Sequence, residues 1–265
     1  MSELTPLFEM AGLLAFVAIG VFARIGAALF LVPGFGERAV PVRVRLGAAL
    51  ALTLLLAPII APLAGQSPPT PAALGWLVLA EAAAGLIIGL AFRLLVMALQ
   101  VCGAIAAQNL SVAHMFGAGV APEPEPTIAT MLGMGGIVLA MIAGLHVHLV
   151  AALTGLYGVL PFGRMPGGAE LAQWSTAQVA GGFALGLSLA LPFVGLAFLY
   201  NLALGAISRA MPQLLVALVG LPLLIGLGLV GLYLVLPELF ARWSVALGLV
   251  LTDPLGGLAP AGPAR

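Results

Sequence analysis

Few residues of this chain could carry chemistry, because charged side chains make up only 7% of its 265 positions and lysine is absent. Three ionisable residues, Arg24, Glu81 and Arg93, fall inside long apolar segments. An unpaired charge there is costly, so each is expected to face a partner or water. Arg24 and Glu81 are expected at similar depths, where they could pair between helices. A structural ion pair, side chains that reach an interface, and a transport site are all compatible with this pattern.

Enzyme and metal chemistry find little support. The sequence has no G-x-S-x-G, H-E-x-x-H or Walker-type motif, and no nucleophile–base pair for an intramembrane enzyme. Glu123 and Glu125 lie in a proline-rich loop that does not obviously hold two carboxylates in place. His146 and His148 would face different directions on a helix, and His114 is remote as a third ligand. We therefore expect no catalysis, no metal and no cofactor.

The most unusual segment spans residues 108–126, QNLSVAHMFGAGVAPEPEP. Its first half is short of the strongly apolar residues that a lipid-facing helix needs. Non-helical backbone at membrane depth is tolerated only where protein buries it or where it lines a water-filled cavity, so this loop could block such a cavity. An ordinary connecting loop is the alternative. The residues that we assign to a plug or gate are Gln108, Asn109, Ser111, His114, Met115, Phe116, Pro122, Glu123 and Pro124.

Composition identifies the surroundings of the chain as lipid or a protein environment nearly as apolar. Hydrophobic residues make up 63%, and nine basic and nine acidic residues give a net charge of zero. In soluble domains roughly a quarter of the residues are charged. Disordered chains combine low hydrophobicity with high net charge, and nucleic-acid binders carry clusters of lysine and arginine. We therefore expect an all-α polytopic integral membrane protein.

Charge-free intervals and turn residues predict about six long helices. Three of them are too long for one straight span, since about 34 residues make a helix about 50 Å long. Breaks or kinks are cheapest near Pro192 and near Gly133, Gly135 and Gly136. The apolar run 243–252 is too short to span. The expected helices cover residues 10–32, 46–64, 72–107, 127–160, 177–208 and 213–236.

Small residues recur at helical spacing in three of these segments. Such spacing lets helix backbones approach closely in lipid, although it also arises by chance in chains rich in alanine and glycine. Together the three sets suggest a tightly packed assembly. They are Gly85 with Gly89, then Gly136, Ala140 and Gly144, then Gly182, Gly186 and Ala190.

The basic residues favour an orientation with both termini on the outer side. Arg164, Arg242 and Arg265 then lie outside. No basic residue precedes the first apolar run, so this run is expected to stay in the mature protein. The arginines expected on the cytoplasmic side are Arg38, Arg43, Arg45 and Arg209, with Arg93 near them.

Several stretches, in order, resemble the FliR family of flagellar biosynthetic proteins. Residues 23–58 read ARIGAALFLVPGFGERAVPVRVRLGAALALTLLLAP, with an arginine in the first helix and a Pro-x-Arg-x-Arg turn into the second. Residues 144–163, GLHVHLVAALTGLYGVLPFG, and 201–214, NLALGAISRAMPQL, are further landmarks. Where the family often has Asp-Pro after the polar stretch, this chain has the repeated Glu-Pro of residues 122–126.

The resemblance implies a core subunit of the flagellar type III export gate in the bacterial inner membrane, at the flagellar basal body. Such subunits form helical hairpins that assemble with FliP and FliQ into a helical pore for unfolded flagellar subunits, and FlhB and FlhA complete the apparatus. Within a single membrane domain it implies a FliP-like part over 10–170, a plug-like loop over 108–126, a FliQ-like hairpin over 177–237 and a C-terminal tail over 238–265. The loop's Met115 and Phe116 would supply an apolar seal.

Two other functions remain open on the sequence. Charges inside spans and broken helices would suit a small-solute secondary transporter, although no internal repeat is convincing. The export-gate subunit of a virulence injectisome is the second alternative.

Overall fold

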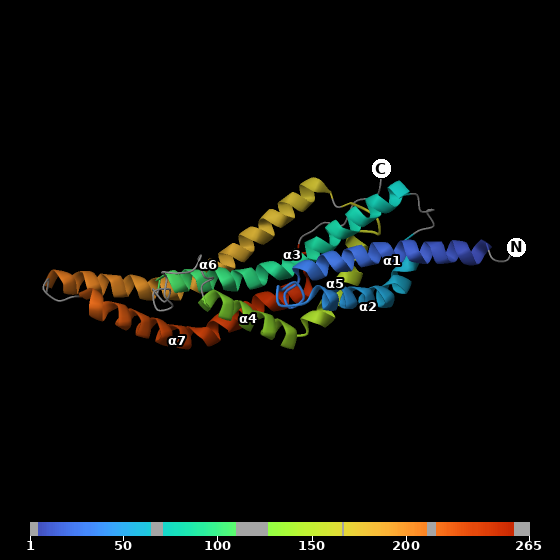
Figure 1. Cartoon of the computed structure of the whole chain (residues 1–265). Coiled ribbons are helices and arrows are strands. Elements are labelled where there is room, and N and C mark those ends of the chain that lie inside the picture. Colours follow the sequence, from blue (N-terminus) through green and yellow to red (C-terminus); the bar gives the residue numbers. More distant parts are fainter. Residues whose placement is uncertain (1–4, 65–70, 110–126, 166, 211–215, 257–265) are drawn as a thin grey trace. The chain divides into compact units, whose positions relative to one another are not determined.

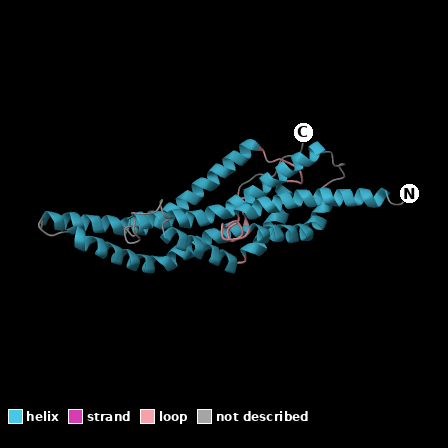
Figure 2. Cartoon of the chain, in the orientation of Figure 1, coloured by secondary structure: helices cyan, strands magenta, loops and turns pink. Residues whose placement is uncertain are grey.

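The computed structural model describes residues 5–64, 71–109, 127–165, 167–210 and 216–256 (Figure 1). Over these ranges every regular element is a helix (Figure 2), which confirms the expected all-α class. Runs rich in leucine and alanine favour helices, and in lipid a helix satisfies its backbone hydrogen bonds internally. The elements are α1 (Thr5–Leu31), α2 (Val42–Ile60), a 3₁₀ turn η1 (Ala61–Leu63), α3 (Pro71–Asn109), α4 (Thr127–Ile142), α5 (Leu145–Val159), α6 (Gly168–Ala210) and α7 (Val216–Thr252).

Length and apolar composition qualify five of the described helices as membrane spans, or up to six if the bent pair α4 and α5 forms one span. This agrees with a polytopic membrane protein. The 39 residues of α3, 43 of α6 and 37 of α7 correspond to helices about 55 to 65 Å long, against about 30 Å of hydrocarbon. These helices must therefore tilt, bend or leave the bilayer.

The fourth expected segment is two helices, and the break is not at the glycines expected for it. Gly133 and Gly136 lie inside α4, whereas the chain turns by 72° between Ile142 and Leu145. The turn occurs at Gly144, whose φ of +84° lies in the left-handed region that favours glycine. Glycine inside a helix only weakens it, whereas a left-handed residue ends it. The chain stays helical through Pro192 of α6.

The last two helices are longer than the sequence pattern predicts. Helix α6 starts at Gly168, and α7 continues through Pro237 to Thr252. The run 243–252, expected to be a short separate segment in the tail, is thus the C-terminal end of α7. Trp174 and Trp243 lie in these extensions and are buried. Their packing stabilises helical turns that the hydropathy pattern alone does not predict.

The chain divides into two compact units, and each is described by itself. Unit 1 comprises Met1–Arg93, Met141–Gln178 and Gly248–Arg265. In it α1 packs along α2, and the two lie side by side in Figure 1. Helix α1 also packs against the first half of α3, because a Cβ added to Gly85 would overlap the carbonyl of Arg24. The small-residue spacing at Gly85 and Gly89 thus coincides with a close backbone approach.

Unit 2 comprises Leu94–Ala140 and Val179–Leu247. Here a Cβ added to Gly186 of α6 would lie 2.8 Å from the carbonyl oxygen of Ala98 of α3. Trp243 of α7 is fully buried and its indole N–H donates to the carbonyl of Leu95 at 2.9 Å. Small residues and one anchored tryptophan therefore bring α6 and α7 against the second half of α3.

Candidate functional site

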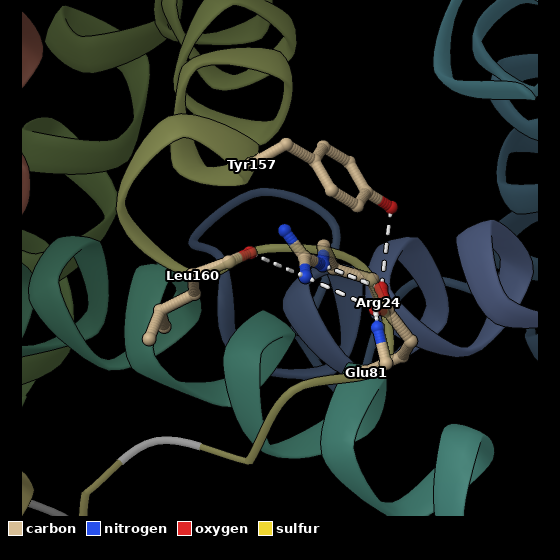
Figure 3. A network of polar contacts seen from close by, with 5 residues as sticks. Arg24, Glu81, Tyr157 and Leu160 are labelled. Atoms are coloured by element: carbon tan, nitrogen blue, oxygen red, sulfur yellow. Dashed lines mark hydrogen bonds and ion pairs between the residues drawn. The ribbon is translucent and has the colours of Figure 1, made fainter. Parts of the chain in front are cut away.

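The best-defined polar cluster of the described residues is centred on Glu81 of α3, which is fully buried. Arg24 of α1, which is 1% exposed, donates from Nε to Glu81 Oε2 at 2.7 Å and from Nη2 to Oε1 at 3.1 Å. Figure 3 shows the guanidinium of Arg24 between the carboxylate and the carbonyl of Leu160. Two residues expected at similar depth thus form a bidentate ion pair between helices.

The segment at the end of α5 completes this cluster. Tyr157 donates its hydroxyl to Glu81 Oε2 at 3.2 Å, and the backbone N–H of Gly163 donates to Oε1 at 2.7 Å. Arg24 Nη2 also donates to the Leu160 carbonyl at 3.1 Å, and its guanidinium carbon lies 3.6 Å from the centre of the Tyr157 ring. Gly163 has a φ of +71°, a conformation that favours glycine. The Arg24–Glu81 cluster therefore joins α1, α3 and the turn after α5.

The carboxylate of this cluster is saturated, whereas Nη1 of Arg24 is buried without a hydrogen-bond partner among the described residues. The Glu81 carboxylate accepts four hydrogen bonds, about as many as its oxygens can take. One cation and one anion cancel, so burial leaves no net charge without a partner. A buried carboxylate held by so many donors is suited to fixing helices in place.

Arg93, the third charge expected inside a span, has a different partner. Its Nη1 lies 2.5 Å from Glu37 Oε1, in the turn between α1 and α2. Both side chains are a little more than a quarter exposed. Arg93 does not join Arg24 and Glu81, so the three charges expected inside spans belong to two separate ion pairs, the second of which is completed by Glu37.

The four arginines expected on the cytoplasmic side differ in burial, and one of them binds backbone carbonyls. Arg45 is half-buried, and donates from Nε to the carbonyl of Phe35 at 2.9 Å and from Nη2 to that of Glu37 at 3.2 Å. Arg38, Arg43 and Arg209 are exposed. The side of the membrane on which each of these residues lies stays a prediction.

The plug residues are described only at their start. Gln108 and Asn109 are the last residues of α3, and Asn109 donates its amide to the carbonyl of Ile105 at 2.8 Å. Gln108 is exposed. The other plug residues, Ser111, His114, Met115, Phe116, Pro122, Glu123 and Pro124, lie outside the described residues.

Metal chemistry gains no support from the described part of the chain. It contains no group of three or more histidine, cysteine, aspartate or glutamate side chains that could hold a metal ion. His146 is exposed and His148 half-buried, both in the first turn of α5.

The sequence allowed the pair of Arg24 with Glu81, but it did not indicate the other partners of the three ionisable residues. Tyr157 and Gly163 stand within the landmark 144–163, yet only the fold shows that they reach Glu81 across 76 and 82 positions. Glu37 was an acidic residue in a loop, with no signal linking it to Arg93. A tyrosine or glutamate beside an apolar run carries no directional information, so no local pattern could have found these contacts.

The chain is similar to known bacterial export proteins along most of its length. The profile described as bacterial export proteins, family 1, matches residues 14–249. The flagellar biosynthetic protein FliR of Caulobacter vibrioides is 35% identical over 230 residues, which cover 86% of this chain and 92% of that protein. FliR of Escherichia coli is 30% identical, with 78% of each chain covered, and FliR of Bacillus subtilis is 27% identical, with 83% and 86% covered.

Proposed function

The chain belongs to the bacterial export proteins, family 1, and is a subunit of the flagellar type III export apparatus, so we propose that it helps to form and seal the export channel. Its place is the bacterial inner membrane at the flagellar basal body. The match over residues 14–249 carries the proposal, because it spans both units rather than one motif. The relatives are flagellar proteins, which favours the flagellum over an injectisome.

The sealing element in this proposal is the segment 108–126, whose first two residues are the end of α3 rather than part of a loop. Met115 and Phe116 would close the channel with apolar side chains, and methionine adapts to irregular shapes. Gln108, Asn109 and Ser111 would hold the loop through hydrogen bonds to neighbouring subunits. The long described helix α3, which ends at Asn109, leads directly into this loop.

The proposed partners are FliP, FliQ, FlhB and FlhA, with unfolded flagellar subunits as cargo. Wide apolar faces of the described helices support assembly with other chains or lipid, since only 28% of the spanning window of α6 and 17% of that of α7 is buried within this chain. In this proposal residues 10–170 act as the FliP-like part and 177–237 as the FliQ-like hairpin, with the hairpin's second helix extended to Thr252.

The rival function, small-solute transport, loses its main support. It rested on Arg24, Glu81 and Arg93 as charges inside spans, together with broken helices, of which the described chain has one at the bend between α4 and α5. Glu81 is saturated by internal donors, and Arg93 is paired with Glu37. Charges engaged within the chain have little capacity left for a solute.

The decisive experiment deletes the gene in its own host and measures hook and filament proteins in the medium, while the tagged protein is purified from the complemented strain. Loss of secretion, together with FliP- and FliQ-like proteins in the purified material, is the expected result. Normal secretion with a stable protein that purifies alone would reject the gate and favour a transporter.

A further inference from the structure

Four arginines lie at or contact the turn between α1 and α2. Arg45 and Arg93, the inner pair, bind groups of the turn, whereas Arg38 and Arg43, the outer pair, are exposed. Arg45 points inward and donates to two carbonyls of the turn. Arg93 reaches the same turn from α3 and pairs with Glu37. These contacts hold the turn in one conformation from both sides. The outer pair, Arg38 and Arg43, is exposed and has no ion pair within the described residues.

The outer pair leaves the turn with uncompensated positive charge. Glu37 is the one acidic residue of the segment 32–45, and Arg93 already neutralises it. Arg38 lies just before the start of α2 and Arg43 just inside it. The two cations therefore stand at the end of the candidate span Val42–Leu63.

An exposed apolar stripe begins at the same place. Val42, Leu46, Leu50 and Leu54 follow one another at four-residue spacing and so share one face of α2. Val42 is 74% exposed and Leu54 78%. Cations at the end of an exposed apolar helix face are typical of the boundary between headgroups and hydrocarbon.

We propose that Arg38 and Arg43 bind the headgroup phosphate of an anionic phospholipid whose acyl chain lies along the apolar stripe of α2. Guanidinium groups match phosphate oxygens in charge and geometry, and basic residues beside a span attract anionic lipids. The contacts of Arg45 and Arg93 support this arrangement, because they hold the turn to which the exposed Arg38 and Arg43 are joined. The inference rests on the membrane location and does not depend on the gating proposal.

The test uses the full-length protein, purified in detergent with the export subunits that accompany it and titrated with phosphatidylglycerol or phosphatidylcholine. Native mass spectrometry counts the lipid molecules that each complex retains. We expect preferential retention of phosphatidylglycerol, weakened about fivefold by Arg38→Gln or Arg43→Gln and about 25-fold by both together. Arg209→Gln, which removes an exposed arginine far along the chain, is the matched control and should leave retention unchanged.

Each other outcome has a distinct meaning. Equal retention of both lipids, or equal losses in the Arg209 control, would overturn a lipid site at this turn. Competition by inorganic phosphate as strong as that of phosphatidylglycerol would show a plain anion site and would also reject the proposal. Unchanged lipid retention with loss of a co-purifying subunit in the double variant would assign the arginines to a protein contact instead. Secretion assays read the gate function separately.

Discussion

At the residue scale, the Arg24–Glu81 cluster shows how a chain with so few charges can bury two of them. The carboxylate meets three partners, and the guanidinium meets the carboxylate, a carbonyl and the face of Tyr157. A buried ion pair contributes little net stability compared with apolar replacements, whereas loss of one partner leaves an uncompensated charge. The pair therefore matters most as a constraint on which helices meet.

Removal of one partner of this pair should be severe. Glu81→Ala or Arg24→Ala is expected to lower the free energy of unfolding by about 3–5 kcal/mol, since the remaining charge stays buried without its counter-ion. Denaturant unfolding of the full-length protein, purified in detergent with the export subunits that accompany it, measures this change. The double variant with Arg24→Met and Glu81→Leu should lose less than either single variant.

Arg93→Ala is the matched control, because the same residue type pairs with a glutamate at a partly exposed position. Its loss should be about 1 kcal/mol or less. If Arg93→Ala and Arg24→Ala cost the same, burial would not be what distinguishes the two ion pairs.

At the element scale, glycines set how closely helices approach. A methyl group at Gly85 would overlap the backbone of α1 at Arg24, and backbone cannot rotate away as a side chain can. We therefore expect Gly85→Ala to destabilise the protein by about 1–3 kcal/mol. Gly75→Ala, on the same helix but with open space around it, should be neutral or stabilising by about 0.5–1 kcal/mol. Detergent unfolding compares the two, and equal effects would contradict close packing of α1 on α3.

The bend between α4 and α5 depends on a single backbone conformation. Gly144 has a φ of +84° and no crowded neighbour, so the effect of Gly144→Ala comes from backbone strain alone. A cost of about 1–2 kcal/mol is expected. Gly158→Ala, within helical α5 and in open space, should instead stabilise. Unfolding midpoints of both variants check this prediction, and no loss for Gly144→Ala would mean that the bend persists without its glycine.

At the scale of the whole molecule, the proposed function needs a seal. Deletion of Met115–Gly119 should let small ions leak through the assembled gate, because the apolar tip of the loop is gone. Ion conductance across the membrane of cells with the deletion, compared with cells that lack the whole gene, measures the leak. The complex must still co-purify with its partners for the comparison to count, and an unchanged conductance in such a complex would remove the loop from the seal.

The sequence by itself determined the class, the approximate helices and the family. Low charge and long apolar runs leave a chain in lipid little choice but helices, so composition and length are enough. The family landmarks lie in local sequence, and comparison with relatives supports them along nearly the whole chain. The predicted helix ends were less accurate, because the packing of the buried Trp174 and Trp243 extends α6 and α7 beyond the ends that hydropathy predicts.

The tertiary structure alone decided which residues meet. Arg24 and Glu81 are 57 positions apart and Tyr157 lies 76 beyond Glu81. Arg93 pairs with Glu37 rather than with either of the other intramembrane charges. An ionisable residue in an apolar segment needs a partner because an unpaired buried charge is costly. This cost does not specify which residue the partner is. Only the packing of α1 on α3, and the turn after α5, selects the partner.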